Sequence, residues 1–500
     1  MKTLHFFGVW LVLSAVGWAQ PAASETEYFA IFMEGKKVGY AIQSRDSTDG
    51  KVITTEKVNM TMSRANVPIT ITITETGIET IDGRPLGFEV VQDFSMMTMK
   101  IAGTVNEQGT VNLTITSMGA EQKSALEWPK GAVMAEGLRL LTLKKGLKEG
   151  LSYTVKIFSP TIMQALDAQI RIGPKRNVDM LGRVVALREV TTTMTMPMTG
   201  EIATTSYVDD ELREQKTVMP MVGMQVEMVA CAKEFALGKN DVLELINKMF
   251  VASPVPLEKV GSAKSITYHL SPTADANILT IPSTDNQSVR LGKDGVVIVT
   301  VEPVAAPAGE RFPYKGKDKT ILEAMQPNRF LQSDNKQIIK LARRAIGGTK
   351  DAAGAVKKIE AFVGDYIENK SLSVGYASAV EVAASRQGDC TEHAVLVAAM
   401  CRAVGIPAQV VTGVAYVEDF AGLQGFGGHA WVQAYVGGDP AGREPGKWVG
   451  LDAAFKSVGL GGYDPGHIAL AVSNGNPEEF FSLVNILGRF KIDKVTVSKK

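Results

Sequence analysis

The chain has 500 residues, so at roughly 150 residues per domain it should contain about three domains. Hydrophobic residues make up 45% of the chain and charged residues 21%, a balance that is ordinary for a folded protein and excludes general disorder. Lysine plus arginine number 53, and so do aspartate plus glutamate, so no overall basic charge exists to attract nucleic acid.

Residues 1–19 have the layout of a secretory signal peptide. Lys2 precedes an uncharged, mostly apolar run from Leu4 to Trp18, and small residues surround a possible cleavage site. The run is shorter than a membrane span requires, although an uncleaved anchor or a buried helix would also fit it. No later stretch is long and apolar enough to cross a bilayer. We therefore expect an exported protein, periplasmic or secreted, with no transmembrane segment in the mature chain.

Residues 24–235 have the pattern of antiparallel β-structure. From Pro68 to Thr74 apolar and polar residues alternate, which is typical of a strand with one buried face. Turn sequences such as Asp82-Gly83 separate such runs at hairpin-like intervals. The pattern predicts a large twisted antiparallel sheet or half-barrel, with a short helix near residues 130–143.

The remaining chain divides at a change of hydrophobic period. Residues 250–305 are again β-rich and should form a small connecting domain, followed by a linker-like stretch of alanine, proline and glycine. Helical spacing then appears at Asn335–Ala345 and at Ala352–Ile367. Residues 310–490 therefore form a third, mixed domain, and the fold class expected for the whole chain is α+β.

Seven methionines gather in two short stretches near the end of the first β-rich domain: Met194, Met196, Met198, Met219, Met221, Met224 and Met228. Thioethers at such spacings can hold Cu(I) in an exported protein. Methionines that alternate along strands also build an adaptable apolar face. Because no histidine accompanies them, packing is the favoured interpretation, and we expect neither a metal nor another cofactor.

Only three cysteines and five histidines occur, which excludes a disulfide scaffold and a cysteine-rich zinc domain. One of them, Cys390, stands at the start of a predicted helix that Gly405 and Pro407 end. Asp389 suits the N-cap, and Glu392 three residues later can complete a capping box. In this first turn the helix dipole and the unpaired N–H groups favour a thiolate and could bind an oxyanion.

A histidine and a carboxylate lie where they could serve this cysteine. His429 stands at the predicted start of one strand, after a glycine-rich segment, and Asp452 ends the next strand. Pairing of these strands as a hairpin would bring the two side chains together. Cys390 would then be the nucleophile, His429 the base and later the acid, and Asp452 the group that fixes the imidazole tautomer. Taken alone, His429 could also be a buried structural histidine.

Three neighbouring features allow two interpretations each. His393, one helical turn after Cys390, should make a structural hydrogen bond, although it could also touch the site. His467 either lines the site or only packs against other residues. The glycine-rich segment Tyr416–Gly428 is either a lid over the site or simply a long loop.

The other two cysteines are expected to be structural. Cys401 follows Cys390 on the same helix, about 16 Å farther along the axis. That separation is too large for a disulfide. Cys401 is therefore a small buried hydrophobe or the partner of Cys231, and Cys390 stays free in either case.

Three motifs in one order resemble the transglutaminase-like superfamily: Gly388-Asp389-Cys390, Gly428-His429-Ala430-Trp431 and Leu451-Asp452. Gly388–Ala394 followed by Gly405–Ala408 is similar to the exported bacterial members of that superfamily in particular. Three motifs in a fixed order are far more specific than any one of them alone.

The resemblance spans about residues 310–475. It implies a papain-like domain that acts through a thioester, with Cys390, His429 and Asp452 as the catalytic triad. Animal transglutaminases also use an upstream tryptophan and bind calcium. Here no tryptophan lies between Trp128 and Cys390, and no calcium-loop pattern occurs, so neither crosslinking nor a metal requirement is implied.

The sequence thus predicts an exported cysteine enzyme that performs acyl transfer at an amide of a protein or peptide. Hydrolysis, as by a peptidase or amidase, is favoured over transamidation because nothing identifies a site for an amine donor. The β-rich module would position the substrate, or bind an envelope partner or an apolar ligand. The alternatives are a binding or assembly protein that keeps the fold without activity, and a carrier of apolar ligands.

Overall fold

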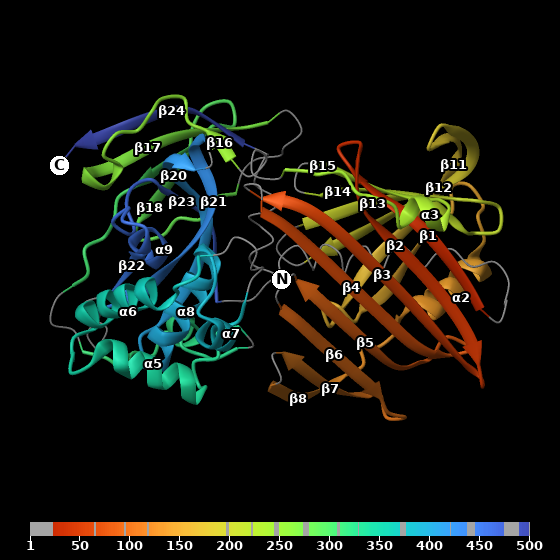
Figure 1. The fold of residues 1–500 in the computed structure, drawn as a ribbon, viewed down its shortest axis with the longest axis horizontal. Helices are drawn as coiled ribbons and strands as arrows, with labels where there is room; N and C mark the ends of the chain where they lie inside the picture. Colours follow the sequence, from red (N-terminus) through yellow and green to blue (C-terminus); the bar gives the residue numbers. More distant parts are fainter. Residues whose placement is uncertain are drawn as a thin grey trace. The chain divides into compact units, whose positions relative to one another are not determined.

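The structure is a computed structural model. It describes residues 24–64, 67–94, 97–117, 120–196, 200–221, 224–244, 250–273, 280–307, 311–328, 330–370, 377–420, 422–437, 446–474 and 490–499. The predicted signal peptide, residues 1–19, lies outside these ranges. The chain divides into two compact units, Met1–Glu244 and Leu245–Lys500 (Figure 1).

One sheet of fifteen strands forms the body of the first unit. Its strands are β1 (Ser24–Met33), β2 (Lys36–Thr48), β3 (Lys51–Arg64), β4 (Val67–Thr80), β5 (Pro85–Phe94), β6 (Met97–Val105), β7 (Thr110–Ser117), β8 (Ala120–Glu127), β9 (Ala132–Val133), β10 (Ser152–Ser159), β11 (Gln164–Met180), β12 (Arg183–Met196), β13 (Gly200–Val208), β14 (Glu214–Met221) and β15 (Met224–Ala230). Consecutive strands are neighbours, β1 pairs with β15, and the path ends at β8 and β9. Every pair is antiparallel except β9 with β10, which confirms the antiparallel β-rich module.

The helix expected near residues 130–143 is present as α2 (Ala135–Lys145). The backbone N–H groups of its first turn find acceptors on the sheet. The carboxylate of Glu79 accepts hydrogen bonds from the N–H groups of Glu136 and Gly137 at 2.7 and 2.9 Å. Glu79 is completely buried. A carboxylate at a helix N-terminus satisfies the donors that the helix leaves free, so this contact fixes α2 on the sheet. A four-residue helix, α3 (Lys233–Ala236), follows β15.

Side chains of the methionine cluster pack in the core of the sheet. Four of them are at most 3% exposed: Met194, Met219, Met224 and Met228. The packing interpretation is confirmed for these four, and the other three side chains lie outside the described part. All three cysteines are free, so no bridge joins Cys231 to Cys401.

The second unit combines two sheets with a group of helices (Figure 1). Its strands are β16 (Phe250–Ala252), β17 (Ala263–Pro272), β18 (Gln287–Leu291), β19 (Val297–Val301), β20 (Ala408–Phe420), β21 (Leu423–Val436), β22 (Lys447–Leu451), β23 (His467–Ser473) and β24 (Phe490–Lys499). The helices are the 3-10 turn η3 (Val260–Ser262), α4 (Lys319–Glu323), α5 (Lys336–Ile346), α6 (Ala352–Tyr366), α7 (Ala379–Ser385), α8 (Cys390–Ala403) and α9 (Ala453–Ser457). One sheet has the order β16-β21-β20-β23, with β22 on β21, and the other has the order β18-β19-β17-β24.

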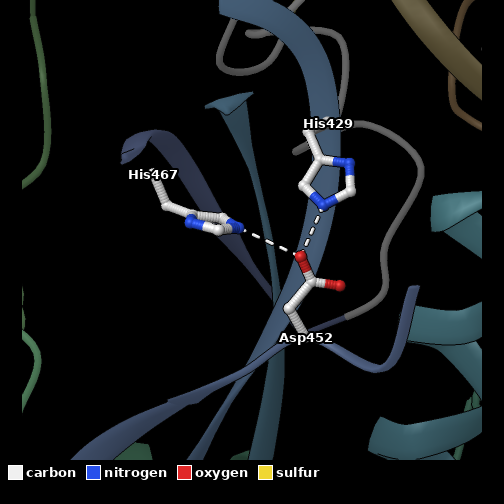
Figure 2. A group of neighbouring side chains, drawn as sticks. All are labelled: His429, Asp452 and His467. Carbon is white, nitrogen blue, oxygen red and sulfur yellow. Dashed lines mark hydrogen bonds and ion pairs between the residues drawn. The ribbon is translucent and has the colours of Figure 1, made fainter. Parts of the chain in front are cut away.

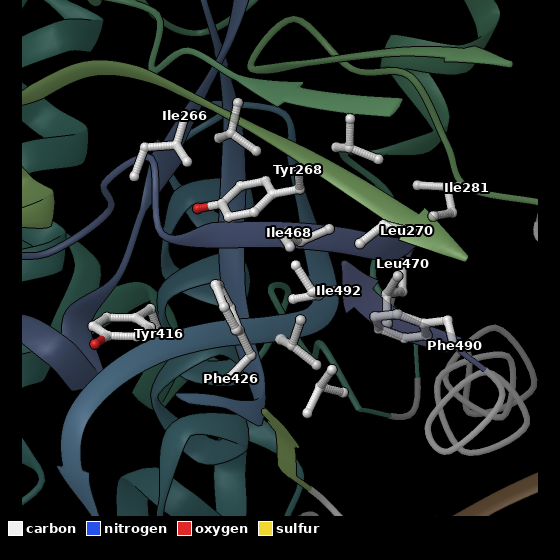
Figure 3. Close-up of a cluster of buried hydrophobic side chains, with 14 of the residues drawn as sticks. Ile266, Tyr268, Leu270, Ile281, Tyr416, Phe426, Ile468, Leu470, Phe490 and Ile492 are labelled. Carbon is white, nitrogen blue, oxygen red and sulfur yellow. The ribbon is translucent and has the colours of Figure 1, made fainter. Parts of the chain in front are cut away.

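Residues 250–305 do not form the separate connecting domain that the sequence predicts. Strand β16 joins the five-stranded sheet through β21, and β17 pairs with the C-terminal strand β24. Buried side chains of both sheets share one core cluster, which includes Tyr268, Phe426 and Ile468 (Figure 3). Strands β17, β18 and β19 alone would leave their apolar face in water, so they are stabilised only by packing on the rest of the unit.

Helix α8 lies at the centre of the second unit. Every residue from Glu392 to Arg402 is buried, and the helix packs against β20, β21 and helices α5, α6 and α7. A helix that is covered on all sides belongs to a core. The helices expected at 335–345 and 352–367 are present as α5 and α6, and their N-caps are Asn335 and Asp351.

The described residues of Tyr416–Gly428 form neither a lid nor a long loop. They lie in the hairpin of β20 and β21, and Gly425 and Gly427 pair with β16. A Cβ atom at Gly425 would come within 2.7 Å of the Val251 carbonyl oxygen, and one at Gly427 within 3.0 Å of the Phe250 ring. The glycines therefore permit close strand approach here, which is why the local loop signal misleads. Among the described helices, none has the length and apolarity needed to cross a membrane.

Candidate active site

Cys390 occupies the first position of α8, as the sequence predicts, and is half-buried. The side chain of Asp389 accepts the Thr391 N–H at 3.0 Å, and Glu392 accepts the Asp389 N–H at 2.9 Å, which completes the capping box. Gly388 has φ +154°, and a Cβ atom there would lie 2.2 Å from the Glu392 Cβ. The backbone can therefore turn into the helix only with glycine at this position. The thiol stands beside amides that have no acceptor within the helix.

Glu392 ties this turn to a second segment. It is completely buried, and its other carboxylate oxygen accepts the Ala377 N–H at 2.8 Å. Burial, reinforced by the charge of Asp389, raises the pKa of Glu392 to about 8. The residue holds residues 377 and 389 in fixed positions, so the start of α8 is rigidly placed.

His429 and Asp452 meet through the predicted hairpin. Strand β22 pairs with β21 in a register that sets Leu451 opposite Val432, and the next residue, Asp452, caps α9. His429 Nε2 lies 2.7 Å from Asp452 Oδ2 (Figure 2). The remaining carboxylate oxygen, Oδ1, accepts the Phe455 N–H at 3.0 Å. The carboxylate is 1% exposed, and its orientation is set by both contacts.

The third member, Cys390, lies close enough to His429 for the two side chains to interact. Since Nε2 of the ring is taken by Asp452, Nδ1 is the atom left for the sulfur. Burial of the ring opposes a positive charge, but the charges of Asp452 and Cys390, and hydrogen bonds with both, outweigh it and raise the pKa of His429 to about 10. Burial disfavours the charge of Asp452, but the charges and hydrogen bonds of His429 and His467 outweigh it and hold the pKa of Asp452 well below its usual range. The three predicted residues are thus brought together, and their catalytic roles remain a prediction.

His467 belongs to this group as well. It is completely buried, and its Nε2 lies 3.0 Å from the same Asp452 Oδ2 (Figure 2). From the sequence, this residue could line the site or only pack, and the structure places it against the carboxylate. It begins β23, which pairs with β20. Because β20 also pairs with β21, strand β20 lies between the strands that carry His467 and His429. Knowledge of the strand order could have found it, but local spacing could not.

His393 makes the structural hydrogen bond that the sequence predicts. Its Nδ1 lies 2.7 Å from the carbonyl oxygen of Asp389, one turn earlier on α8. The ring is 2% exposed, and burial lowers its pKa. His393 therefore supports the helix start and is not a member of the hydrogen-bonded chain through Asp452.

His429, Asp452 and His467 offer three potential metal ligands, whose ligating atoms all lie within 4.8 Å of one another. Both histidines, however, approach one carboxylate oxygen at 2.7 and 3.0 Å, which are hydrogen-bond lengths. A metal ion would have to replace both N–H protons and would end the contact between His429 and Asp452. The geometry therefore fits a hydrogen-bonded network.

Comparison with known proteins agrees with this geometry. Residues 339–453 match the family model of the transglutaminase-like superfamily, a range that includes Cys390, His429 and Asp452. The resemblance seen in the sequence is confirmed, and the C-terminal domain is transglutaminase-like. No curated protein matches the sequence of this chain.

Two solved structures are similar to parts of the chain. One is a candidate cysteine protease from Cytophaga hutchinsonii, 19% identical, which covers 47% of this chain and 88% of its own with a TM-score of 0.31. The other is a beta-barrel-like protein of a domain of unknown function from Brucella abortus, 10% identical, which covers 42% of this chain and 96% of its own with a TM-score of 0.33. Both overlaps are too weak to carry an argument about chemistry.

Proposed function

We propose that the transglutaminase-like domain of this protein is a cysteine hydrolase that cleaves amide bonds of a protein or peptide through a thioester on Cys390. One observation carries the proposal: at the start of a buried helix, His429 lies between Asp452, to which it is hydrogen-bonded, and Cys390, whose charge acts on the ring. A nucleophile, a base and a group that orients the base are the parts that such a reaction needs.

Acylation would begin with attack of the Cys390 sulfur on the substrate carbonyl carbon. The tetrahedral oxyanion would be stabilised by the Cys390 N–H at the start of α8, which has no acceptor within the helix, whereas the next N–H, of Thr391, is already accepted by Asp389. His429 would then donate its Nδ1 proton to the amide nitrogen as the C–N bond breaks. The products of this step are a free amine and a thioester on Cys390.

Deacylation would run the proton transfer in reverse. His429, now neutral, takes a proton from a water molecule, and the oxygen attacks the thioester carbonyl. Cleavage of the C–S bond releases a carboxylic acid and regenerates the paired cysteine and histidine. The Asp452 carboxylate, 1% exposed, keeps the ring oriented throughout and stabilises its charged form.

Water and a primary amine would compete for this thioester. We favour water because nothing in the sequence identifies a site for an amine donor. The test is incubation of the full chain with a peptide library, with and without a primary amine, followed by mass spectrometry of the products. Hydrolysis predicts new carboxyl ends in both mixtures, whereas amide adducts in the amine mixture would indicate transamidation. Products that persist with Cys390→Ala would overturn the proposal.

Export and the use of the first unit are further parts of the proposal. The signal-like residues 1–19 support an exported, periplasmic or secreted enzyme, which cell fractionation with an antibody would test. The large sheet would position a protein or peptide substrate or bind an envelope partner. A binding protein without activity is the alternative. It predicts that Cys390 reacts with iodoacetamide no faster than a model thiol at neutral pH.

A ligand-carrier role of the sheet is also testable. Native mass spectrometry of protein purified from its host would reveal a co-purified apolar ligand. If the protein carries no such ligand and still hydrolyses peptides, substrate positioning remains the role of the first unit. A stoichiometric apolar ligand would favour the carrier role.

A further inference from the structure

The hydrogen-bonded chain of the site continues beyond Asp452. His467 Nε2 approaches Asp452 Oδ2 at 3.0 Å, and the same oxygen accepts from His429 at 2.7 Å. Figure 2 shows the two imidazoles converging on this one oxygen from different strands. The oxygen of Asp452 that faces His429 is therefore shared between two histidines.

The partners of His467 define its protonation. Its Nδ1 lies 3.0 Å from Asp464 Oδ1 and 3.1 Å from the Asp464 carbonyl oxygen. The shorter contacts of both ring nitrogens are to acceptor oxygens, of Asp464 on one side and of Asp452 on the other, while the Asp464 N–H approaches Nδ1 at 3.4 Å. A histidine that donates from both nitrogens is an imidazolium. Burial disfavours this charge, but the hydrogen bonds and charges of the two carboxylates outweigh it and raise the pKa of His467.

Apart from His429, the other described neighbours of His467 are uncharged. The ring is completely buried and packed by Phe455, Tyr463 and Trp431, with centroid distances of 4.9, 4.9 and 5.1 Å. Of these, Tyr463 is titratable, and burial holds its pKa above its usual range, so it stays neutral. A charge in such surroundings is stable only when it is paired. Asp452 and Asp464 are the two groups that pair it.

Among the described residues, the other titratable groups near the site contact Asp452, Asp464 or their neighbours and not the His467 ring itself. Cys390 lies beyond His429, and Glu360 accepts the Asp452 N–H at 2.8 Å. Tyr268 donates its hydroxyl to the Pro465 carbonyl, and Asp464 raises the pKa of this tyrosine beyond the effect of burial. His393 is influenced by the charge of Asp452. In the part of the chain that the structure describes, Asp452 and Asp464 are therefore the groups that hold the cation on His467.

We propose that His467, held by Asp464, is a positioning residue that locks Asp452 in place and weakens its pull on the His429 proton. The inference rests on the proposed function, because it assigns a role within that reaction. A second donor on Oδ2 divides the negative charge that His429 faces, and the two rings lie only 5.6 Å apart. The imidazolium of His429 becomes a stronger acid, which suits protonation of a leaving amine.

The test is the pH profile of kcat/KM for peptide cleavage by the full chain and its His467→Gln variant. Glutamine keeps an N–H donor for Asp452 but removes the positive charge. Removing a nearby positive charge raises the pKa of His429, so the basic limb should move upward by about one to two pH units. Asp464→Asn should move the limb in the same direction by a smaller amount. His269→Gln, the same change on β17, is the matched control and should leave the profile in place.

A purely structural role would lower the rate at every pH without moving the basic limb, and that result would overturn the proposal. If His467→Gln does not fold, Asp464→Asn carries the test, because its side chain can still accept the Gly466 N–H. Nitrogen NMR of the Cys390→Ala protein separates this inference from the proposed function, since it needs no activity. It should show both nitrogens of His467 protonated at neutral pH, and a neutral ring would refute the assignment.

Discussion

Replacement of Asp452 by asparagine should cost stability and activity together. The carboxylate is 1% exposed and accepts hydrogen bonds from His429 at 2.7 Å and from His467 at 3.0 Å. Removing one partner of a buried ion pair leaves the other charge uncompensated, at a cost of about 3–5 kcal/mol. Asparagine can still accept the Phe455 N–H, so the cap of α9 survives, whereas Asp452→Ala should lose about 1 kcal/mol more.

The assay is urea denaturation at several pH values. A probe such as tryptophan fluorescence monitors unfolding of the second unit. Asp452 is the main group that raises the pKa of His429 to about 10 against burial. The stability that His429 contributes is therefore full below its unfolded pKa of about 6.5 and is lost as pH rises through 10. In Asp452→Asn this loss between pH 6.5 and 10 should flatten, and kcat/KM should fall by about 100- to 10,000-fold. An asparagine variant within about 1 kcal/mol of wild type would refute the charged network.

Three further changes test other parts of the account. Gly388→Ala should abolish activity and destabilise the second unit by about 1–3 kcal/mol, because Gly388 has a φ of +154°. At Gly348 a Cβ atom would meet nothing within 4 Å, so Gly348→Ala should change neither the melting temperature nor the rate of peptide cleavage. Burial raises the pKa of Glu214 to about 8, so its cost to the stability of the first unit is absent below about pH 4.5, grows between pH 4.5 and 8, and is constant above that range. Glu214→Gln should therefore stabilise that unit by about 1–3 kcal/mol at pH 9, and its stability in urea should depend less on pH. Cys401 is completely buried and burial raises its pKa to about 12, so iodoacetamide should modify Cys390 long before Cys401, by peptide mapping of the folded protein.

Local sequence was enough to place the cysteine and its helix. Asp389 and Glu392 flank Cys390 at the spacing of a capping box, and that interaction is made within four residues. The hairpin that joins His429 to Asp452 was also predictable, because β21 and β22 are close in sequence. Such features depend on contacts between near neighbours, which a sequence pattern records.

Longer-range contacts were not accessible in this way. His467 contacts Asp452 because β23 lies beside β20 rather than beside β22, an order that hydrophobic spacing does not encode. The glycines of Tyr416–Gly428 indicate a loop when considered alone, but β16, far earlier in the chain, pairs with Gly425 and Gly427. The independence predicted for residues 250–305 failed for the same reason, since the partner of β17 is the last strand, β24.

Detection of an acyl-enzyme tests the central claim most directly. A peptide substrate is mixed with the full chain, quenched in acid within the first turnover and analysed by intact mass and peptide mapping. The account predicts an added acyl group on Cys390 that hydroxylamine removes, at a level that falls in Asp452→Asn and vanishes in Cys390→Ala. Peptide cleavage with no adduct on Cys390, or an adduct that persists in Cys390→Ala, would contradict it.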